Sequence, residues 1–450
     1  EGKTSPRIIG AAKQKHPLGC PQKKIISALI LIFPLLAALA LIVLAGPRDA
    51  RVVSSERVAT GDIQRDSALS TGSDLTPRAF LPLLALNDED ALRSFRVGYC
   101  STNMDVTRYP DIGELKAGWY LNFAPDPDPE YPLGMDHVQV VRLHQLTECY
   151  PDRVRDREAC PYVEPYTYTV DYPDTSAALR TIVEQNRGVL WLIGNEIDRY
   201  DWGGVNPWNS DIVTPVDPWQ GQDEMMPELY AQAYHELYHL IKGADPTALV
   251  ANGSIVQATP ARLEYMSRVW DAYRKRYGRD MPVDVWNVHN FILKERCDDW
   301  GADVPPGYSG CKGTVYDDRD HDSMEIFQGQ IQAFRAWMRE RGQQNKPLVV
   351  SEFGVLYQHA GMEDPEVVRE FMLAAFDYLM NEKDCALGYP ADDCRLVQRW
   401  AWFSLDSPVF NRYGRLFDPW SREMTGLGES FASYTGQHLD IEGSETPAYW

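Results

Sequence analysis

The sequence predicts an α/β fold, a (β/α)8 TIM barrel that follows an N-terminal transmembrane segment and a flexible stalk. Eight short apolar runs rich in β-forming residues recur along the chain, and helical segments separate most of them. An uncharged run of 22 residues near the start predicts the membrane segment. The composition, 44% apolar and 24% charged, is that of a globular protein with a large core.

The apolar run covers residues 25–46 and is long enough to cross a bilayer as a helix. Basic residues crowd the segment 1–24, so the positive-inside rule predicts a cytoplasmic tail there and a body outside the cytoplasm. A cleaved signal peptide is the alternative, because small residues follow the run. We favour an uncleaved signal anchor in the cell membrane, since the run exceeds a usual signal core; cleavage would instead give a secreted protein.

Charge excludes one class of partner. The chain carries a formal charge of −21, and because its first 46 residues carry +5, the remaining 404 carry −26. Such a body repels phosphate backbones, so we expect no binding of nucleic acid. Residues 47–90 are rich in Ser, Arg, Asp and Thr without periodicity, which predicts a flexible stalk between the bilayer and a domain at 91–450.

The cysteines indicate an oxidising compartment. Three pairs lie close in sequence within polar stretches, and we expect each to form a disulfide: Cys149 with Cys160, Cys297 with Cys311, and Cys385 with Cys394. Zinc is the alternative ligand, but none of the pairs has the close spacing of a metal knuckle. Cys100 is left without a partner.

Eight runs are predicted as strands: 95–100, 118–123, 138–144, 189–196, 248–254, 283–291, 347–354 and 397–405. Apolar residues recur every three or four positions at 224–243, 260–277, 322–342 and 364–382, which predicts helices. Alternation of strand and helix predicts parallel pairing and a closed barrel. An open doubly wound sheet is the alternative, but no glycine-rich phosphate turn follows the first strand.

Two carboxylates fall at the ends of predicted strands. Glu196 ends the fourth strand and Glu352 ends the seventh. In a barrel the reacting groups lie at the C-terminal ends of strands, and strands four and seven face each other across the mouth. Two carboxylates placed in this way can flank a glycosidic bond. Either one alone could be a salt-bridged strand end, so their joint placement carries the hypothesis.

The chain resembles the clan of retaining (β/α)8 glycoside hydrolases in which an Asn-Glu pair ends the fourth strand and a Glu ends the seventh. Asn195-Glu196 matches the first signature, and Glu352 within Ser-Glu-Phe-Gly matches the second. The resemblance implies that Asn195 holds a sugar hydroxyl, that Glu196 is the acid/base and that Glu352 is the nucleophile. It also implies roles for His289 on the sixth strand and for Trp402 on the eighth, where the clan places an aromatic ring under the reacting sugar.

The second strand, Gly-Trp-Tyr-Leu-Asn-Phe, is similar to that of compact endo-β-1,3-glucanases of this clan. The match is partial, because Ile197 and Phe123 replace that family's Pro and second Trp. Phe291 replaces the Tyr that binds the nucleophile in much of the clan. A phenyl ring donates no hydrogen bond, so we expect His289 or Asn290 to supply one.

Burial behind an apolar strand is expected to raise the pKa of the acid Glu196, whereas Glu352 must stay ionised. The long loop after the fourth strand carries Trp202, Trp208 and Trp219, and we expect at least one of these rings to stack on a sugar. The remaining candidate substrate-binding residues are Tyr120, Asn122, Arg142 and His144, with Gln145, Asn252 and Gln257 as weaker ones.

The string His235-Glu236-Leu237-Tyr238-His239 matches the H-E-x-x-H motif of zinc peptidases. On a helical wheel, however, both histidines lie opposite the apolar face that contains Leu237, on the outer side of the barrel. We therefore disfavour a metallopeptidase. The sequence predicts a retaining glycoside hydrolase of a β-linked glycan, without metal or organic cofactor. A catalytically inactive carbohydrate-binding barrel, serving as a surface receptor, is the alternative.

Overall fold

Eight parallel strands form the predicted barrel in the computed structural model, which describes residues 94–102, 105–150, 156–173, 175–200 and 222–439. All of these belong to one unit, Leu75–Trp450. The predicted cytoplasmic tail, transmembrane segment and stalk lie outside the described residues. Within the described part of the chain, no helix is long and apolar enough to cross a membrane.

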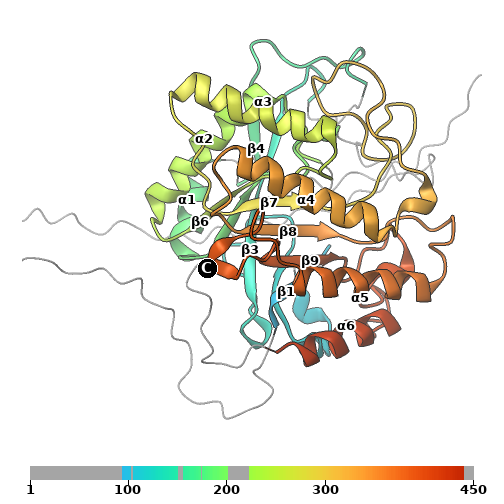
Figure 1. Cartoon of the computed structure of the whole chain (residues 1–450). Coiled ribbons are helices and arrows are strands. Elements are labelled where there is room, and N and C mark those ends of the chain that lie inside the picture. The colour runs from blue at the N-terminus through green and yellow to red at the C-terminus, as the bar shows by residue number, and fades with distance from the viewer. Residues whose placement is uncertain (1–93, 103–104, 151–155, 174, 201–221, 440–450) are drawn as a thin grey trace, which may run out of the picture. The chain divides into compact units, whose positions relative to one another are not determined.

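The strands follow the predicted order and pair with their neighbours in parallel (Figure 1). They are β1 (Ser94–Cys100), β2 (Ala117–Leu121), β3 (Asp136–Gln145), β5 (Leu190–Ile193), β6 (Leu249–Asn252), β7 (Trp286–His289), β8 (Leu348–Phe353) and β9 (Arg399–Phe403). The order in the sheet is β6-β5-β3-β2-β1-β9-β8-β7. Sequence neighbours are therefore spatial neighbours all round the sheet, as in a (β/α)8 barrel.

The barrel closes between β6 and β7, where strand pairing is weakest. Ala251 and Val285 form an isolated parallel bridge there. The side chain of Asn252 completes the seam: it accepts a hydrogen bond from the Asn287 backbone N–H at 2.9 Å and donates one to the Asn287 carbonyl at 2.9 Å. This amide therefore stands in for missing ladder hydrogen bonds, which is a structural role for a residue that we considered for binding.

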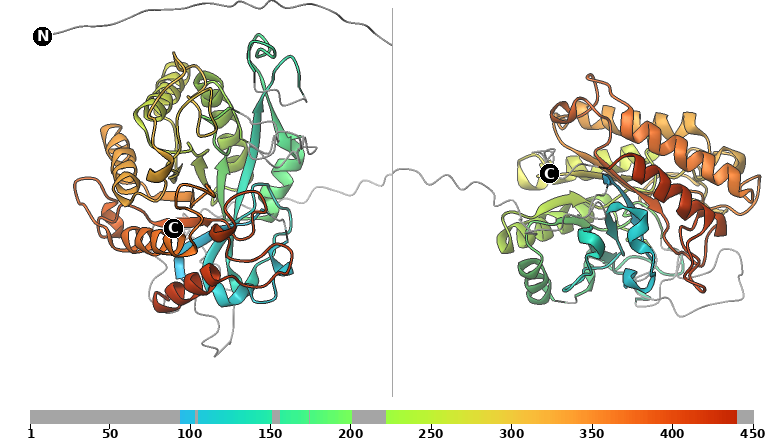
Figure 2. Two further views of the ribbon diagram at one scale, coloured as in Figure 1. Left: turned by 90° about the vertical axis from the view of Figure 1, so that its right-hand side faces the viewer. Right: turned by 90° about the horizontal axis from the view of Figure 1, so that it is seen from below.

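The four predicted helices are α2 (Pro227–Ala244), α3 (Pro260–Tyr277), α4 (Met324–Glu340) and α5 (Pro365–Asn381). Figure 1 and Figure 2 show helices packed around the outside of the strands. Their boundaries follow local chemistry, since α2, α3 and α5 begin with proline, whose fixed backbone angle suits the first helical position. Gly278 ends α3 in the left-handed region at φ 67°.

Three elements were absent from the prediction. A short strand β4 (Tyr168–Tyr172) pairs antiparallel with the end of β3, outside the barrel order. Helix α1 (Ser176–Gln185) lies beside α2, and helix α6 (Gly426–Gln437) lies beside α5. Thr175 and Thr425 cap them, because each side chain accepts a hydrogen bond from a first-turn N–H.

All three predicted disulfides are present: Cys149–Cys160, Cys297–Cys311 and Cys385–Cys394. Cys100 is free and buried. The first two pairs close loops that follow the C-terminal ends of β3 and β7, on the side where a barrel carries its active site. The third lies before β9, at the opposite end of the strands.

Candidate active site

A tight turn after β5 carries Glu196 to the mouth of the barrel. Gly194 adopts φ 99° and Glu196 itself adopts φ 47°, a left-handed conformation that is uncommon for a residue with a side chain. Hydrogen bonds hold the turn from two sides: Asn195 N–H donates to Asp223 Oδ2 at 2.9 Å, and Glu196 N–H donates to Ser254 Oγ at 3.2 Å. The position of Glu196 is therefore fixed by the backbone.

Glu352 and His289 lie side by side on adjacent strands, in register between β8 and β7. His289 Nε2 lies 3.1 Å from Glu352 Oε1, and His289 Nδ1 lies 3.5 Å from Glu196 Oε1. One buried imidazole thus contacts both carboxyl groups that the sequence predicted to converge. Glu352 Oε1 has no aligned hydrogen-bond donor among the described residues, although it is buried.

Arg199 is the cation that contacts Glu196 most closely among the described residues. Its Nη1 lies 2.8 Å from Glu196 Oε2, and both side chains are buried. Burial alone would raise the pKa of Glu196, but the charge of Arg199 and the hydrogen bonds from His289 and Arg199 outweigh burial and lower that pKa to about 2. Glu196 is therefore held as a carboxylate.

The environment of Glu352 acts in the opposite direction. Burial raises the pKa of Glu352 well above its usual range, and the charge of Glu196 raises it further. Arg142 and Arg199 oppose this rise, but neither forms an ion pair with Glu352. The pKa of Glu196 is therefore lowered and that of Glu352 raised, which is the reverse of the pattern that the sequence predicted. The missing information was the cation beside Glu196, which burial arguments cannot reveal.

Arg142, whose charge acts on Glu352, is part of a buried ion pair. Its Nη2 lies 2.8 Å from Asp223 Oδ1, and its Nε donates to the same oxygen at 2.8 Å. Asp223 also accepts the backbone N–H of Leu143 at 3.0 Å and that of Asn195. This pair joins β3 to the Glu196 turn, so Arg142 has a structural role and also places positive charge near Glu352.

Asn195 and Asn290 both lie at the mouth. Asn195 precedes Glu196 in the turn described above and is 9% exposed. Asn290 donates its backbone N–H to the Glu352 carbonyl at 2.9 Å and its side-chain N–H to the Phe327 carbonyl at 3.1 Å. Asn290 therefore binds backbone carbonyls of β8 and α4. Of the two residues expected to donate to the Glu352 carboxylate, His289 is the one that contacts it.

Phe291 forms part of an apolar wall beside the carboxylates. Its ring packs edge-on against His289, with centroids 5.9 Å apart, and against Phe403, with centroids 6.1 Å apart. Phe123 packs against Phe403 at 6.3 Å. The two phenylalanines that replace family aromatics thus gather with Phe403 around the mouth, where they exclude water from one side of the site.

Trp402 does not lie under a reacting sugar. The side chain is fully buried, its indole N–H donates to the Gly414 carbonyl at 2.8 Å, and its ring packs against Phe371 and Phe376 of α5. Side chains alternate along a strand, so Trp402 points outward and Phe403 takes the inner position at the end of β9. The expectation for Trp402 is therefore corrected, and Phe403 is the residue of β9 whose ring packs with Phe291 at the mouth.

Tyr120 and Asn122 also face away from the carboxylates. The Tyr120 hydroxyl donates to the Glu130 carbonyl at 2.6 Å, and its ring stacks on Tyr99. Asn122 Oδ1 lies 3.0 Å from His137 Nε2. The Trp119 ring lies under Arg399 on the inner side of the barrel. Because side chains alternate along a strand, Tyr120 and Asn122 point to the outer side. Neither supports the expected binding role.

The other candidates are distributed as follows. His144 is buried and packs against Tyr150 at 5.8 Å. Gln145 accepts the Met226 N–H at 2.7 Å, and Gln257 bonds both backbone groups of Leu293. These two glutamines therefore pin loops. Trp202, Trp208 and Trp219 lie outside the described residues.

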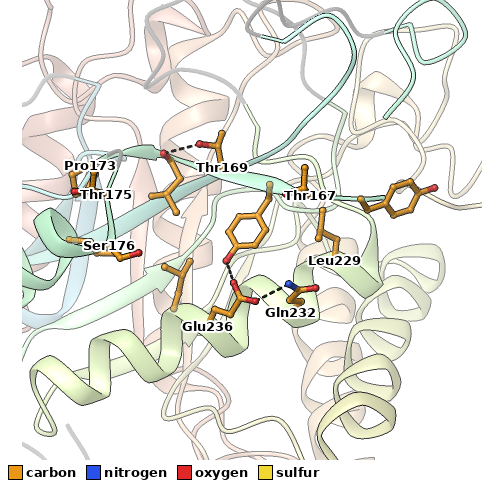
Figure 3. A pocket seen from close by; sticks show the side chains of 13 residues that line it. Thr167, Thr169, Pro173, Thr175, Ser176, Leu229, Gln232 and Glu236 are labelled. Atoms are coloured by element: carbon orange, nitrogen blue, oxygen red, sulfur yellow. Dashed lines mark hydrogen bonds between the residues drawn. The ribbon is translucent and has the colours of Figure 1, made fainter. Parts of the chain in front are cut away.

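The H-E-x-x-H string packs α2 against its neighbours. His235 Nδ1 lies 2.8 Å from the Tyr273 hydroxyl, and Arg279 donates to His239 Nε2 at 2.8 Å. Glu236 points instead into a groove of about 380 Å³ between β4, α1 and α2, where it accepts hydrogen bonds from Tyr168 and Gln232 (Figure 3). The three side chains of the string therefore have separate partners, and none of the candidate residues of the mouth lines this groove.

Two residues of the mouth escaped the sequence reasoning. Arg199 stands three positions after Glu196, a spacing that also occurs by chance in any charged loop. Phe403 could have been found, because strict alternation along Arg-Trp-Ala-Trp-Phe puts the two tryptophans on one face and Phe403 with Ala401 on the other. The resemblance drew attention to Trp402 instead.

No protein-family model matches the chain, and no curated protein matches it. Similar solved structures include a GH128 (subgroup II) endo-β-1,3-glucanase from Pseudomonas viridiflava, with 14% identity over 76% of this chain and 98% of that chain and a TM-score of 0.45. The enzyme of that name from Sorangium cellulosum has 16% identity over 75% and 98%, with a TM-score of 0.44. A GH5_18 protein from Streptomyces cattleya has 13% identity over 79% and 82%, with a TM-score of 0.42.

These three structures are of glycoside hydrolases from the clan that the sequence resembles, and two of them are endo-β-1,3-glucanases. At such identities and TM-scores the likeness says nothing about the reaction of this chain.

Proposed function

We propose that the protein is a retaining glycoside hydrolase that cleaves a β-linked glycan or oligosaccharide. One observation carries the proposal: Glu196 follows β5 and Glu352 lies on β8, and a single imidazole, that of His289, contacts both. Two buried carboxyl groups in such proximity, at the C-terminal ends of barrel strands, are the machinery of glycoside hydrolysis.

In the first step, an oxygen of the Glu352 carboxylate attacks the anomeric carbon while the bond to the leaving oxygen breaks. The proton of the Glu196 carboxyl group moves to that leaving oxygen, and a glycosyl ester forms on Glu352. His289 contacts the reacting Glu352 oxygen, and Phe403 and Phe291 keep the neighbouring wall apolar. A dry wall strengthens the electrostatic interactions within the site.

In the second step, the Glu196 carboxylate takes a proton from water as the water oxygen attacks the anomeric carbon. The ester bond to Glu352 breaks, and both residues return to their starting forms. Each cycle uses one proton shared between two carboxyl groups. Their pKa values are shifted in opposite directions, which supports a pair that carries one proton near neutral pH.

We also infer that this domain works outside the cytoplasm. Three disulfides within the described residues support this location, because such bonds persist in oxidising compartments. The apolar run at 25–46 and its basic flank support a membrane anchor.

A substrate panel tests the proposal. The purified protein is incubated with β-1,3-glucan, β-1,4-glucan, mannan, xylan and aryl β-glycosides, and released reducing ends are measured. We expect release from at least one substrate by the wild type and none by the Glu352→Gln variant. Binding of a glycan without release from any of them would instead favour the carbohydrate-binding barrel.

A further inference from the structure

Arg199 and Glu196 form a buried contact that an acid catalyst does not need. The Nη1 atom of Arg199 lies 2.8 Å from Glu196 Oε2, and each side chain is 5% exposed. The Nη2 atom donates to the Gly301 carbonyl at 2.7 Å. The guanidinium carbon lies 6.0 Å from the centre of the Trp300 ring. Arg199 is thus held between the acid and the loop that follows β7.

This contact opposes the role of Glu196. A general acid must hold a proton before it can give one to the leaving oxygen, but a carboxylate that accepts a hydrogen bond from a guanidinium is stabilised in its ionised form. Arginine cannot supply the missing proton, because it stays protonated in proteins. The ion pair must therefore weaken before the first chemical step.

The leaving-group sugar is the natural agent of this change. The acid contacts the oxygen that departs with that sugar, so Arg199, in contact with the acid, borders the leaving-group side of the scissile bond. Sugar hydroxyl oxygens can accept the N–H groups of a guanidinium. The hydrogen bond to the Gly301 carbonyl can hold Arg199 in place when the contact with Glu196 is lost. The Nε atom of Arg199 has no hydrogen-bond partner among the described residues.

We propose that Arg199 is a positioning residue that keeps Glu196 ionised until a sugar binds on the leaving-group side. The sugar hydroxyl groups then replace Glu196 as the hydrogen-bond partner of Arg199. The inference rests on the proposed function and adds a control to it. Water alone at the mouth leaves Glu196 paired and unable to protonate a leaving group. A bound glycan releases Glu196, which can then take up the proton that it gives to the leaving oxygen.

Other charges face this pair and must be considered. They are His289 from β7, Glu352 from β8, Arg142 from β3, Arg262 from α3, and Asp198 in the same turn as Arg199. Arg262 is itself paired with Asp198 and Glu295, and Arg142 with Asp223. Only Arg199 forms an ion pair with Glu196 within the described residues, apart from the His289 contact.

The test compares pH profiles of kcat/KM on an oligosaccharide for the wild type, Arg199→Gln, Arg199→Met and Arg199→Lys. Loss of a cation makes both carboxyl groups harder to ionise, so both limbs of the profile should move to higher pH in the Gln and Met variants. We expect a shift of roughly one to three pH units. The Lys variant keeps the charge and should keep the limbs near the wild-type positions. Coincident limbs in all four proteins would overturn the inference.

A second measurement avoids variants of Arg199. In Glu352→Gln the only titrating carboxyl group of the catalytic pair is Glu196. Calorimetry of oligosaccharide binding at about pH 5, in two buffers of different ionisation enthalpy, counts the protons taken up. Release from Arg199 predicts uptake of up to one proton per sugar bound, and binding without uptake contradicts it. Failure of the proposed function would look different, because the wild type would then cleave nothing.

Discussion

His289 Nε2 lies 3.1 Å from Glu352 Oε1, and the other ring nitrogen of His289 faces Glu196. The neighbouring Phe291 cannot donate a hydrogen bond, so of these two residues only His289 can donate one to Glu352. Burial lowers the pKa of His289, so the ring is neutral near pH 7. A neutral ring can donate from one nitrogen only, and that nitrogen serves one carboxylate at a time.

Glu352→Gln is expected to reduce kcat/KM by at least about 10³-fold, because an amide cannot form the glycosyl ester. Sugar binding, measured by calorimetry, should stay nearly unchanged. Glu366→Gln is a matched control: Glu366 is exposed on α5 and pairs only with Arg369 among the described residues, so its activity should equal that of the wild type. Hydrolysis by Glu352→Gln at the wild-type rate would rule out Glu352 as the nucleophile.

Azide can assign the two roles. In Glu196→Ala, azide should occupy the space of the lost carboxyl group, attack the glycosyl ester and yield a β-glycosyl azide from an activated β-glycoside. In Glu352→Ala, azide should attack the anomeric carbon directly and yield the α-product. Anomeric configuration is read by proton NMR. The opposite pair of products would exchange the roles of the two residues.

His321 makes stability depend on acid. Its Nδ1 donates to the Ile292 carbonyl, its Nε2 accepts the Leu356 N–H, and burial lowers its pKa to about 4. In the unfolded chain a His side chain has a pKa of about 6.5. Between that pH and the lower pKa of the folded state, His321 is protonated in the unfolded chain but neutral in the folded protein. We expect about 3 kcal/mol of stability to be lost between pH 6.5 and pH 4.

Urea unfolding of the wild type and His321→Gln at several pH values measures this effect. The variant lacks the titrating ring, so its deficit in unfolding free energy should be largest at pH 7 and should shrink as the pH falls. A deficit that is the same at pH 7 and pH 4.5 would show that His321 is not buried as a neutral ring.

The Cys297–Cys311 disulfide closes the loop that contains Gly301, the second anchor of Arg199. Replacing both cysteines with serine should lower the unfolding free energy by roughly 3 kcal/mol, the value for a loop of about 15 residues. It should also raise KM, because the anchor of Arg199 loosens.

The Cys385–Cys394 disulfide provides the control, since it closes a loop of similar size at the opposite end of the strands. Its double serine variant should lose comparable stability and keep the wild-type KM. An equal rise in KM for both double variants would mean that the first disulfide acts through global stability alone.

Strand periodicity was sufficient to predict the barrel, because each of the eight apolar runs is a strand whose ends determine what reaches the mouth. Glu196 and Glu352 followed from this rule. β4 was missed because it is only five residues long and pairs with β3 outside the barrel order. α1 could have been predicted, because Leu179, Ile182 and Val183 recur at helical spacing after the cap at Thr175. The cap of α6 at Thr425 was visible in the sequence but was not used.

Electrostatics were harder to predict than placement. The sequence places Glu196 close behind a buried strand, but the direction of its pKa depends on where Arg199 folds, and a loop has no period that fixes this. Trp402 illustrates a different limit. A family position was transferred to the nearest tryptophan, whereas the alternation of β9 turns that ring towards α5 and gives Phe403 to the mouth.

The central claim is that Glu352 forms a covalent bond to the sugar. A 2-deoxy-2-fluoro β-glycoside with an activated leaving group slows release of the ester more than its formation, so the adduct should accumulate. After proteolysis, mass spectrometry should locate one fluoroglycosyl group per chain on Glu352. The activity of the wild type on the parent substrate should be lost at the rate at which this label appears. Full activity after prolonged incubation, or a label on any other residue, would contradict the account.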